Sequence, residues 1–122
     1  MLRAAFTKST SGHVAVEFAL ILPALAMVIV GTMYAGLVMY SVSGLHSAVA
    51  AGARCFSVNS TQCGSTSATQ TYAQGQYYGV NSPTFTASVA SCGHEVSATV
   101  TLTFDIGLAS WNIPISATSC FP

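Results

Sequence analysis

A long apolar segment dominates the first third of the chain. From Phe18 to Tyr40 the sequence reads FALILPALAMVIVGTMYAGLVMY, and Thr32 is its only clearly polar side chain apart from the tyrosine hydroxyls. A helix needs about 20 apolar residues to cross the roughly 30 Å hydrocarbon layer of a membrane. The segment therefore predicts a transmembrane helix over about residues 18–40, inside a longer N-terminal helix over residues 13–54.

The chain changes character after Arg54. Residues 57–67 are rich in Ser, Thr, Asn and Gln, which is typical of a loop. The next stretch, residues 67–78, has apolar and aromatic side chains near helical spacing, and Gly79 follows as a stop: Ala68, Tyr72, Ala73 and Tyr77. We therefore expect a loop followed by one short amphipathic helix.

The C-terminal third alternates between apolar and polar residues, which is typical of strands with one buried face. Residues 95–104 read EVSATVTLTF, and residues 84–91 and 112–118 alternate likewise. The predicted inward residues of these three strands are Phe85, Ala87 and Val89, then Val96, Ala98, Val100, Leu102 and Phe104, then Ile113, Ile115 and Ala117.

The predicted strands are expected to form one small antiparallel sheet. Cys92-Gly93-His94 is the expected turn between the first two strands, and Pro114 indicates that the third is an edge strand. The expected fold class is α+β: a long transmembrane helix, then a disulfide-stabilised domain over residues 55–122 with a short helix and a three-stranded antiparallel sheet.

Charge is scarce in this chain. Of 122 residues, 52% are hydrophobic and 5% are charged, with three Lys or Arg and three Asp or Glu. A soluble domain usually has roughly 25% charged residues. Three scattered basic residues cannot neutralise a run of phosphates, so a nucleic-acid partner is not expected. The composition indicates a membrane, a secreted compartment or an assembly.

The flanks of the apolar segment predict its orientation. Arg3 and Lys8 precede it, and the next basic residue is Arg54. The positive-inside rule then places the N-terminus in the cytoplasm and the C-terminal domain outside. All four cysteines lie on the predicted outer side, where two disulfides can form. Four cysteines allow three pairings, and we favour Cys55 with Cys63 and Cys92 with Cys120, because each pair brackets one local unit.

An ordinary secretory signal peptide is the plain alternative. Its apolar region usually has about 7–15 residues, and the segment here is longer. Ala48-Val49-Ala50 has the small residues of a cleavage site, but it lies well beyond the apolar segment. We therefore prefer the transmembrane helix.

The start of the apolar segment carries a carboxylate at a specific spacing. Gly12 precedes His13, and Glu17 is the fifth residue counted from His13. A short basic leader, a glycine, then a glutamate at this position and a long apolar helix together resemble the type IV prepilin signal. The string GHVAVEFALILPALAMVIVGTMYAG is further similar to the TadE/TadG-like family of tight-adherence (Tad) pilus assembly proteins.

The resemblance implies how the chain is processed and assembled. Residues 1–12 would be a cytoplasmic leader, which a prepilin peptidase removes between Gly12 and His13. Glu17 would then pair with the new N-terminal amine of a neighbouring subunit, because pairing offsets the desolvation of both charges at a lipid boundary. The implied location is the bacterial inner membrane with the C-terminal domain in the periplasm or outside, and the implied partners are the membrane, the peptidase and other Tad subunits.

Further candidate chemistry in the chain is weak. Pro23 within the predicted helix removes one backbone hydrogen bond and predicts a kink. Ser, His94, Glu95 and Asp105 allow a catalytic triad to be written, but no nucleophile motif supports it. Cys92 and His94 lack a second pair at zinc-like spacing. We expect no catalytic residue, metal, cofactor or small-molecule substrate.

Two hypotheses follow. The chain is either a minor pilin-like structural subunit (a pseudopilin) that assists Tad pilus assembly, adhesion and biofilm growth, or an uncleaved single-pass protein. In the second case its outer domain binds a partner in an envelope secretion complex. Glu17 separates the two, because an assembly subunit needs its charge and a plain anchor does not.

Overall fold

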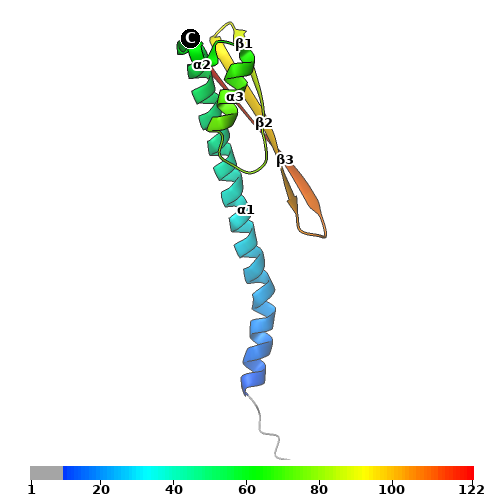
Figure 1. The fold of residues 1–122 in the computed structure, drawn as a ribbon. Helices are drawn as coiled ribbons and strands as arrows, with labels where there is room; N and C mark the ends of the chain where they lie inside the picture. The colour runs from blue at the N-terminus through cyan, green and yellow to red at the C-terminus, as the bar shows by residue number, and fades with distance from the viewer. Residues whose placement is uncertain (1–9) are drawn as a thin grey trace, which may run out of the picture. The chain divides into compact units, whose positions relative to one another are not determined.

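The computed structural model, drawn in Figure 1, describes residues 10–122. The chain divides into two compact units, the first ending at Ala35 and the second beginning at Gly36. The predicted leader lies outside the described residues as far as residue 9. The elements in chain order are α1 (Thr10–Val58), α2 (Ser60–Cys63), α3 (Thr66–Gln76), β1 (Thr84–Ala90), β2 (Gly93–Asp105) and β3 (Ser110–Phe121). Helix α1 runs through both units, and all other elements belong to Gly36–Pro122, called the second unit below.

The three strands form one antiparallel sheet in the order β1-β2-β3. Ala98 of β2 lies opposite Phe85 on one side and Ala117 on the other, so the apolar positions of all three strands share a face. Pro114 lies in the edge strand β3, as predicted. The α+β fold class is confirmed, and it follows from the period-two pattern of the strands.

The core of the second unit lies between this sheet face, the C-terminal part of α1 and α3. Its buried residues are Leu45, Ala48, Val49 and Ala53 of α1, Ala73 of α3, and Phe85, Ala87, Val96, Ala98, Val100, Leu102 and Ala117 of the sheet. The α1 residues recur at intervals of three and four, so one stripe of the helix faces the sheet. Small residues on this stripe allow close approach: a Cβ built on Gly52 would lie 3.0 Å from the Ala73 Cβ.

Two predicted inward residues are exposed in the structure: Val89 of β1 and, at 39%, Ile113 of β3. The Val89 side chain is 72% exposed, although it has the same parity as the buried Phe85 and Ala87. Val89 lies in an edge strand, one residue before its end, and opposite His94 beside the turn. The alternating pattern continues there, but the packed core has already ended at Ala87.

The turn between β1 and β2 is also displaced from its predicted position. Ala90 pairs with Gly93, so Ser91 and Cys92 form the turn and His94 lies within β2. Gly93 has φ +124°, and a Cβ there would meet the carbonyl oxygen of Phe121 at 2.5 Å. Glycine is therefore required at this position by both its backbone angle and its close neighbour.

The segment predicted as a loop over residues 57–67 is partly helical. Helix α1 continues to Val58, and α2 follows after the Asn59 cap, whose Oδ1 accepts a hydrogen bond from Gln62 N at 3.1 Å. The next helix begins after Ser65, whose hydroxyl oxygen accepts from Ala68 N at 3.2 Å, and it ends two residues before the predicted boundary at 78. Asn and Ser oxygens satisfy free N–H groups at helix starts, so polar residues here begin helices as well as forming loops.

Both disulfides link parts of the second unit. Cys55 bonds Cys63, which joins the end of α1 to α2, and Cys92 bonds Cys120, which joins the β1–β2 turn to the end of β3. This is the pairing that we favour from the sequence. Both bridges lie at the end of the core where the Ser57 hydroxyl donates to the Pro122 carbonyl oxygen. Small domains commonly need such cross-links.

Candidate functional site

The residues of the prepilin-like motif lie in the first two turns of α1. Gly12, His13 and Glu17 are all exposed, and a Cβ built on Gly12 would have no other atom within 4 Å. His13 and Glu17 are four residues apart, so they lie on the same face of the helix. The only Lys or Arg among residues 10–122 is Arg54, near the other end of α1. Within the described part of a single chain, Glu17 is therefore a carboxylate without a nearby Lys or Arg.

In the first unit, which ends at Ala35, the large apolar side chains of α1 are exposed. The helix is long and apolar enough to cross a membrane, and no residue of its most apolar window is buried. The exposed large residues of the first unit are Val14, Val16, Phe18, Leu20, Ile21, Leu22, Leu25, Met27, Val28, Ile29, Val30 and Met33. They occupy every side of the helix, so it needs lipid or other apolar helices around it.

Two residues inside the apolar part of α1 affect its backbone. The Thr32 hydroxyl donates a hydrogen bond to the Ile29 carbonyl oxygen at 2.8 Å, so this polar group is satisfied within the helix. Pro23 lies inside α1, which continues through it as one helix. The kink at Pro23 stays a prediction.

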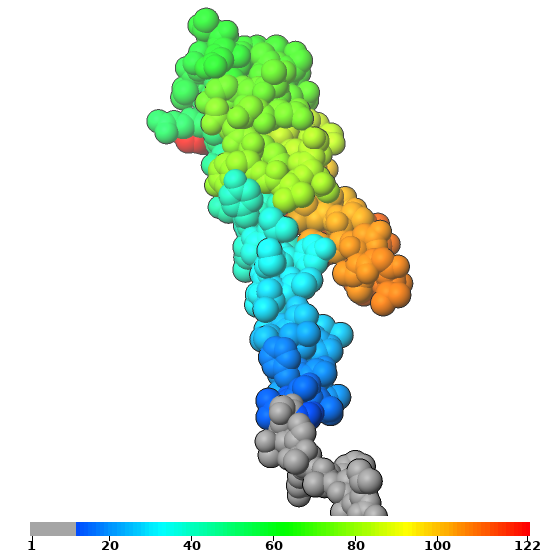
Figure 2. All heavy atoms as spheres, turned by 60° about the horizontal axis from the view of Figure 1, so that its bottom comes forward, coloured from blue at the N-terminus to red at the C-terminus, as the bar shows by residue number. Residues whose placement is uncertain are grey.

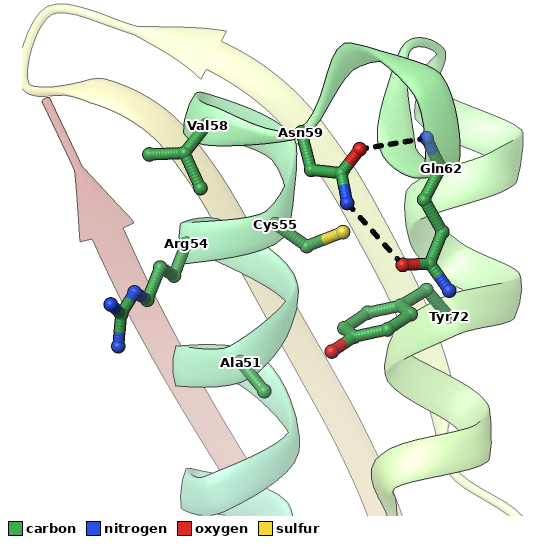
Figure 3. A pocket seen from close by; sticks show the side chains of 7 residues that line it. All are labelled: Ala51, Arg54, Cys55, Val58, Asn59, Gln62 and Tyr72. Atoms are coloured by element: carbon green, nitrogen blue, oxygen red, sulfur yellow. Dashed lines mark hydrogen bonds between the residues drawn. The ribbon is translucent and has the colours of Figure 1, made fainter.

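A pocket of about 360 Å³ lies in the second unit between α1, α2 and α3. Its lining residues are Ala51, Arg54, Cys55, Val58, Asn59, Gln62 and Tyr72. Figure 3 shows Asn59 and Gln62 bonded to each other beside the Tyr72 ring, with the Arg54 guanidinium pointing away from them. The Asn59 and Gln62 side chains are bonded to each other, Asn59 also caps α2, and Cys55 is in a disulfide. The pocket therefore holds no arrangement of a nucleophile and a base.

The residues considered for catalysis or metal binding are engaged in contacts within the second unit. The His94 ring contacts Phe56 edge-to-face, with centroids 4.6 Å apart, and its buried Nδ1 has no hydrogen-bond partner among the described residues. Cys92 is in a disulfide, and the Asp105 carboxylate accepts from Gly107 N at 2.7 Å. Among residues 10–122, no group of three or more His, Cys, Asp or Glu side chains is placed to hold a metal ion.

The fold and the exposed helix thus describe a class of protein: a single apolar N-terminal helix that fits one membrane crossing, and a small disulfide-bonded α+β unit. Residues 12–54 match the family described as TadE-like protein. The match begins at Gly12, ends at Arg54 and covers most of α1, which confirms the resemblance stated from the sequence. No curated protein and no solved structure matches the chain significantly. The match covers about a third of the chain and none of the three strands.

Proposed function

We propose that this protein is a pilin-like minor subunit (a pseudopilin) of a Tad pilus assembly machine, processed by a prepilin peptidase between Gly12 and His13. The observation that carries the proposal is the family match, which starts at Gly12 and includes Glu17 and the apolar helix. Its role is structural, because it primes or supports assembly of the pilus, and so adhesion and biofilm growth.

The proposed location is the bacterial inner membrane, with the N-terminus in the cytoplasm and the second unit in the periplasm or outside. The distribution of Lys and Arg around the apolar segment supports this orientation. The two disulfides support it independently, because they persist in oxidising compartments and both lie in the second unit.

Glu17 has a physical role in this proposal. A carboxylate at the edge of the hydrocarbon layer is costly unless it is paired. Removal of the leader creates an ammonium group on His13, and the same charge appears on every neighbouring subunit. Pairing between subunits would satisfy both groups and would fix the axial register of adjacent helices.

A matched pair of glycine variants tests the processing step. Gly12 and Gly31 both lie in α1, and a Cβ at either position would meet no other atom within 4 Å. Gly12→Leu and Gly31→Leu are therefore equally compatible with the helix. If a peptidase requires the glycine at the cleavage site, only Gly12→Leu retains the leader, as measured by the mass of the protein from native membranes. Equal processing of both variants would contradict the proposed site.

A second pair tests the assembly role. Glu17→Gln removes the charge with little change of shape, and Glu95→Gln does the same in the second unit. We expect roughly tenfold or greater loss of cross-linking to other Tad subunits, and loss of surface pili, only for Glu17→Gln, because removing one partner leaves a lone buried charge. If Glu17→Gln assembles normally and the native N-terminus is Met1, the uncleaved partner-binding anchor replaces the pseudopilin.

A further inference from the structure

The β2–β3 hairpin extends beyond the rest of the sheet. The pairing of β1 with β2 stops at Thr99, so β2 from Val100 onward pairs with β3 alone. Figure 2 shows this two-stranded part as a separate orange lobe that projects from the green body of the second unit. The lobe ends in the connection 106–109.

The end of this lobe is apolar, and two hydrogen bonds hold its turn. We call Ile106, Leu108 and Trp111 the hairpin tip; Leu108 is 95% exposed and the other two about half exposed. Ile106 N donates to the Ala109 carbonyl oxygen at 3.2 Å, and Gly107 N donates to Asp105 Oδ1. Two N–H groups of the connection are therefore hydrogen-bonded within the turn, which lowers the cost of placing it near lipid.

The charge around the tip is minimal. Between Val96 and Pro122 the only formally charged residue is Asp105, and its carboxylate is held by the Gly107 N–H. Three large apolar side chains that face water do not stabilise a turn. The combination of an exposed tryptophan with apolar neighbours is characteristic of side chains at a membrane–water interface.

Contacts within the second unit place the tip at the end where the apolar segment enters. Val80 N donates to Ser41 Oγ at 3.2 Å, and the next residue, Asn81, donates to the Thr101 carbonyl oxygen at 2.7 Å. Thr101 of β2 therefore lies near the level of Ser41, which directly follows the apolar segment. A strand rises about 3.3 Å per residue, so Asp105 lies about 13 Å further along the ribbon.

Within the second unit, this extension runs toward the N-terminal end of its part of α1. Val96 lies beside Gly52, with 3.5 Å between the Val96 Cγ1 and a Cβ built on the glycine. From Val96 to Thr101 the strand thus passes from the level of Gly52 to that of Ser41, and the tip continues the same way. Tyr40 and Tyr78 meet near Ser41 with ring centroids 5.2 Å apart, and both are partly exposed. Two tyrosines and a tryptophan thus gather at this end of the unit.

We propose that the hairpin tip inserts into the interfacial layer of the same membrane that α1 crosses, so that the second unit is attached to the lipid surface at two places. The occupant of the apolar tip is lipid, at the boundary between headgroups and acyl chains. The proposal rests on the membrane-spanning role of α1 in the proposed function, and it does not depend on processing or on pilus assembly. It predicts that the second unit rests against the membrane surface.

Trp111 is the only tryptophan of the chain and reports directly on the tip. The full chain is reconstituted into phosphatidylcholine vesicles with ordinary or brominated acyl chains, and flotation measures its association with the vesicles. We expect emission shifted to shorter wavelength than that of indole in water, with most of it lost in brominated vesicles. A control with the reporter moved, Trp111→Phe with Tyr72→Trp, is expected to keep its emission, because Tyr72 lies at the pocket beside Arg54 and Cys55.

A second pair of variants tests the insertion without disturbing the core. Leu108 and Val89 are both highly exposed. Leu108 lies in the connection that follows β2, whereas Val89 pairs with His94 near the start of β2. Leu108→Glu is expected to reduce the quenching of Trp111 strongly, whereas Val89→Glu should leave it unchanged. Equal effects of the two variants would overturn the proposal.

The remaining outcomes each decide the question. A chain that floats with vesicles while Trp111 is quenched by aqueous acrylamide and not by bromine overturns the insertion alone. Emission that is blue-shifted, insensitive to bromine and dependent on protein concentration means that a second copy covers the tip, which also overturns it. A chain that fails to float contradicts the membrane helix, and with it both this inference and the proposed function.

Discussion

Alanine at Gly44 is expected to destabilise the second unit, whereas alanine at Gly75 is expected to stabilise it slightly. Both glycines lie within helices, Gly44 in α1 and Gly75 in α3. A Cβ on Gly44 would overlap the carbonyl oxygen of Tyr78 and would lie 2.9 Å from its carbonyl carbon. A Cβ on Gly75 would meet no other atom within 4 Å. The two substitutions are chemically identical, so their difference isolates the close approach of α1 to the chain at Tyr78.

The expected magnitudes come from two opposing effects. Alanine is better than glycine in a helix by about 1 kcal/mol, and this gain applies to both positions, though less near a helix end. Overpacking a core usually costs about 1–3 kcal/mol, and the cost is greatest where backbone rather than a flexible side chain must move. Gly44→Ala should therefore lower the free energy of unfolding by about 2 kcal/mol, a large part of the stability of a small domain. Gly75→Ala should raise it by up to about 0.5–1 kcal/mol.

The assay is a urea titration of the full chain in a non-ionic detergent, without reductant, followed by the circular dichroism of the sheet. Unchanged slopes with shifted midpoints would show that stability alone has changed. A Gly44→Ala protein as stable as the wild type would refute the reasoning, because Tyr78 could not then lie against α1 as the structure has it.

Further substitutions test the two disulfides and the core of the second unit in the same urea titration. Replacing Cys92 and Cys120 by alanine should cost about 3.6 kcal/mol, and replacing Cys55 and Cys63 about 2.5 kcal/mol, because the closed loops span 28 and 8 residues. The reverse order of the two losses would contradict the loop-entropy explanation. Leu45→Ala should cost about 3–5 kcal/mol, because this side chain is fully buried and its loss leaves a cavity. A decrease in the free energy of unfolding of less than about 1 kcal/mol would mean that Leu45 of α1 does not pack against the sheet.

The sheet was predictable because its residues obey one strong local rule. Buried and exposed positions alternate without interruption from Val96 to Leu102, so both the strand and its inward face can be derived from the sequence. Val89 shows the limit of the rule, because parity fixes a side chain's face but not where the covering helices end. The short α2 was missed because Asn and Ser favour loops and helix caps alike, and only the tertiary contacts decide between them.

The hairpin tip was also missed by the sequence analysis. The third strand was expected to begin at Asn112, although it begins at Ser110. Ile106 and Leu108 continue the even-numbered apolar positions of β2, so the pattern does not mark where that strand ends. The sequence did contain a pattern that indicates the hairpin tip. One apolar residue lies on each side of Gly107, between two stretches with strand-like alternation. Their exposure depends on where β1 stops pairing, and that is a tertiary property.

The candidate site, unlike the hairpin tip, is defined by the sequence more than by the fold of one chain. The sequence motif from Gly12 to Pro23 carries more information than the structure of one chain, because a processing site is read by a peptidase and Glu17 is expected to pair with another subunit. The structure adds that Gly12 and Glu17 are exposed, and that no Lys or Arg lies near Glu17 in the described part of α1.

The most direct test of the account is the intact mass and N-terminal sequence of the protein recovered from native membranes, with and without reductant. The account predicts an N-terminus at His13 and a mass that rises on reduction by two hydrogen atoms for each of the two disulfides. An N-terminus at Met1 would contradict the pilin-like mechanism and would leave an uncleaved membrane anchor.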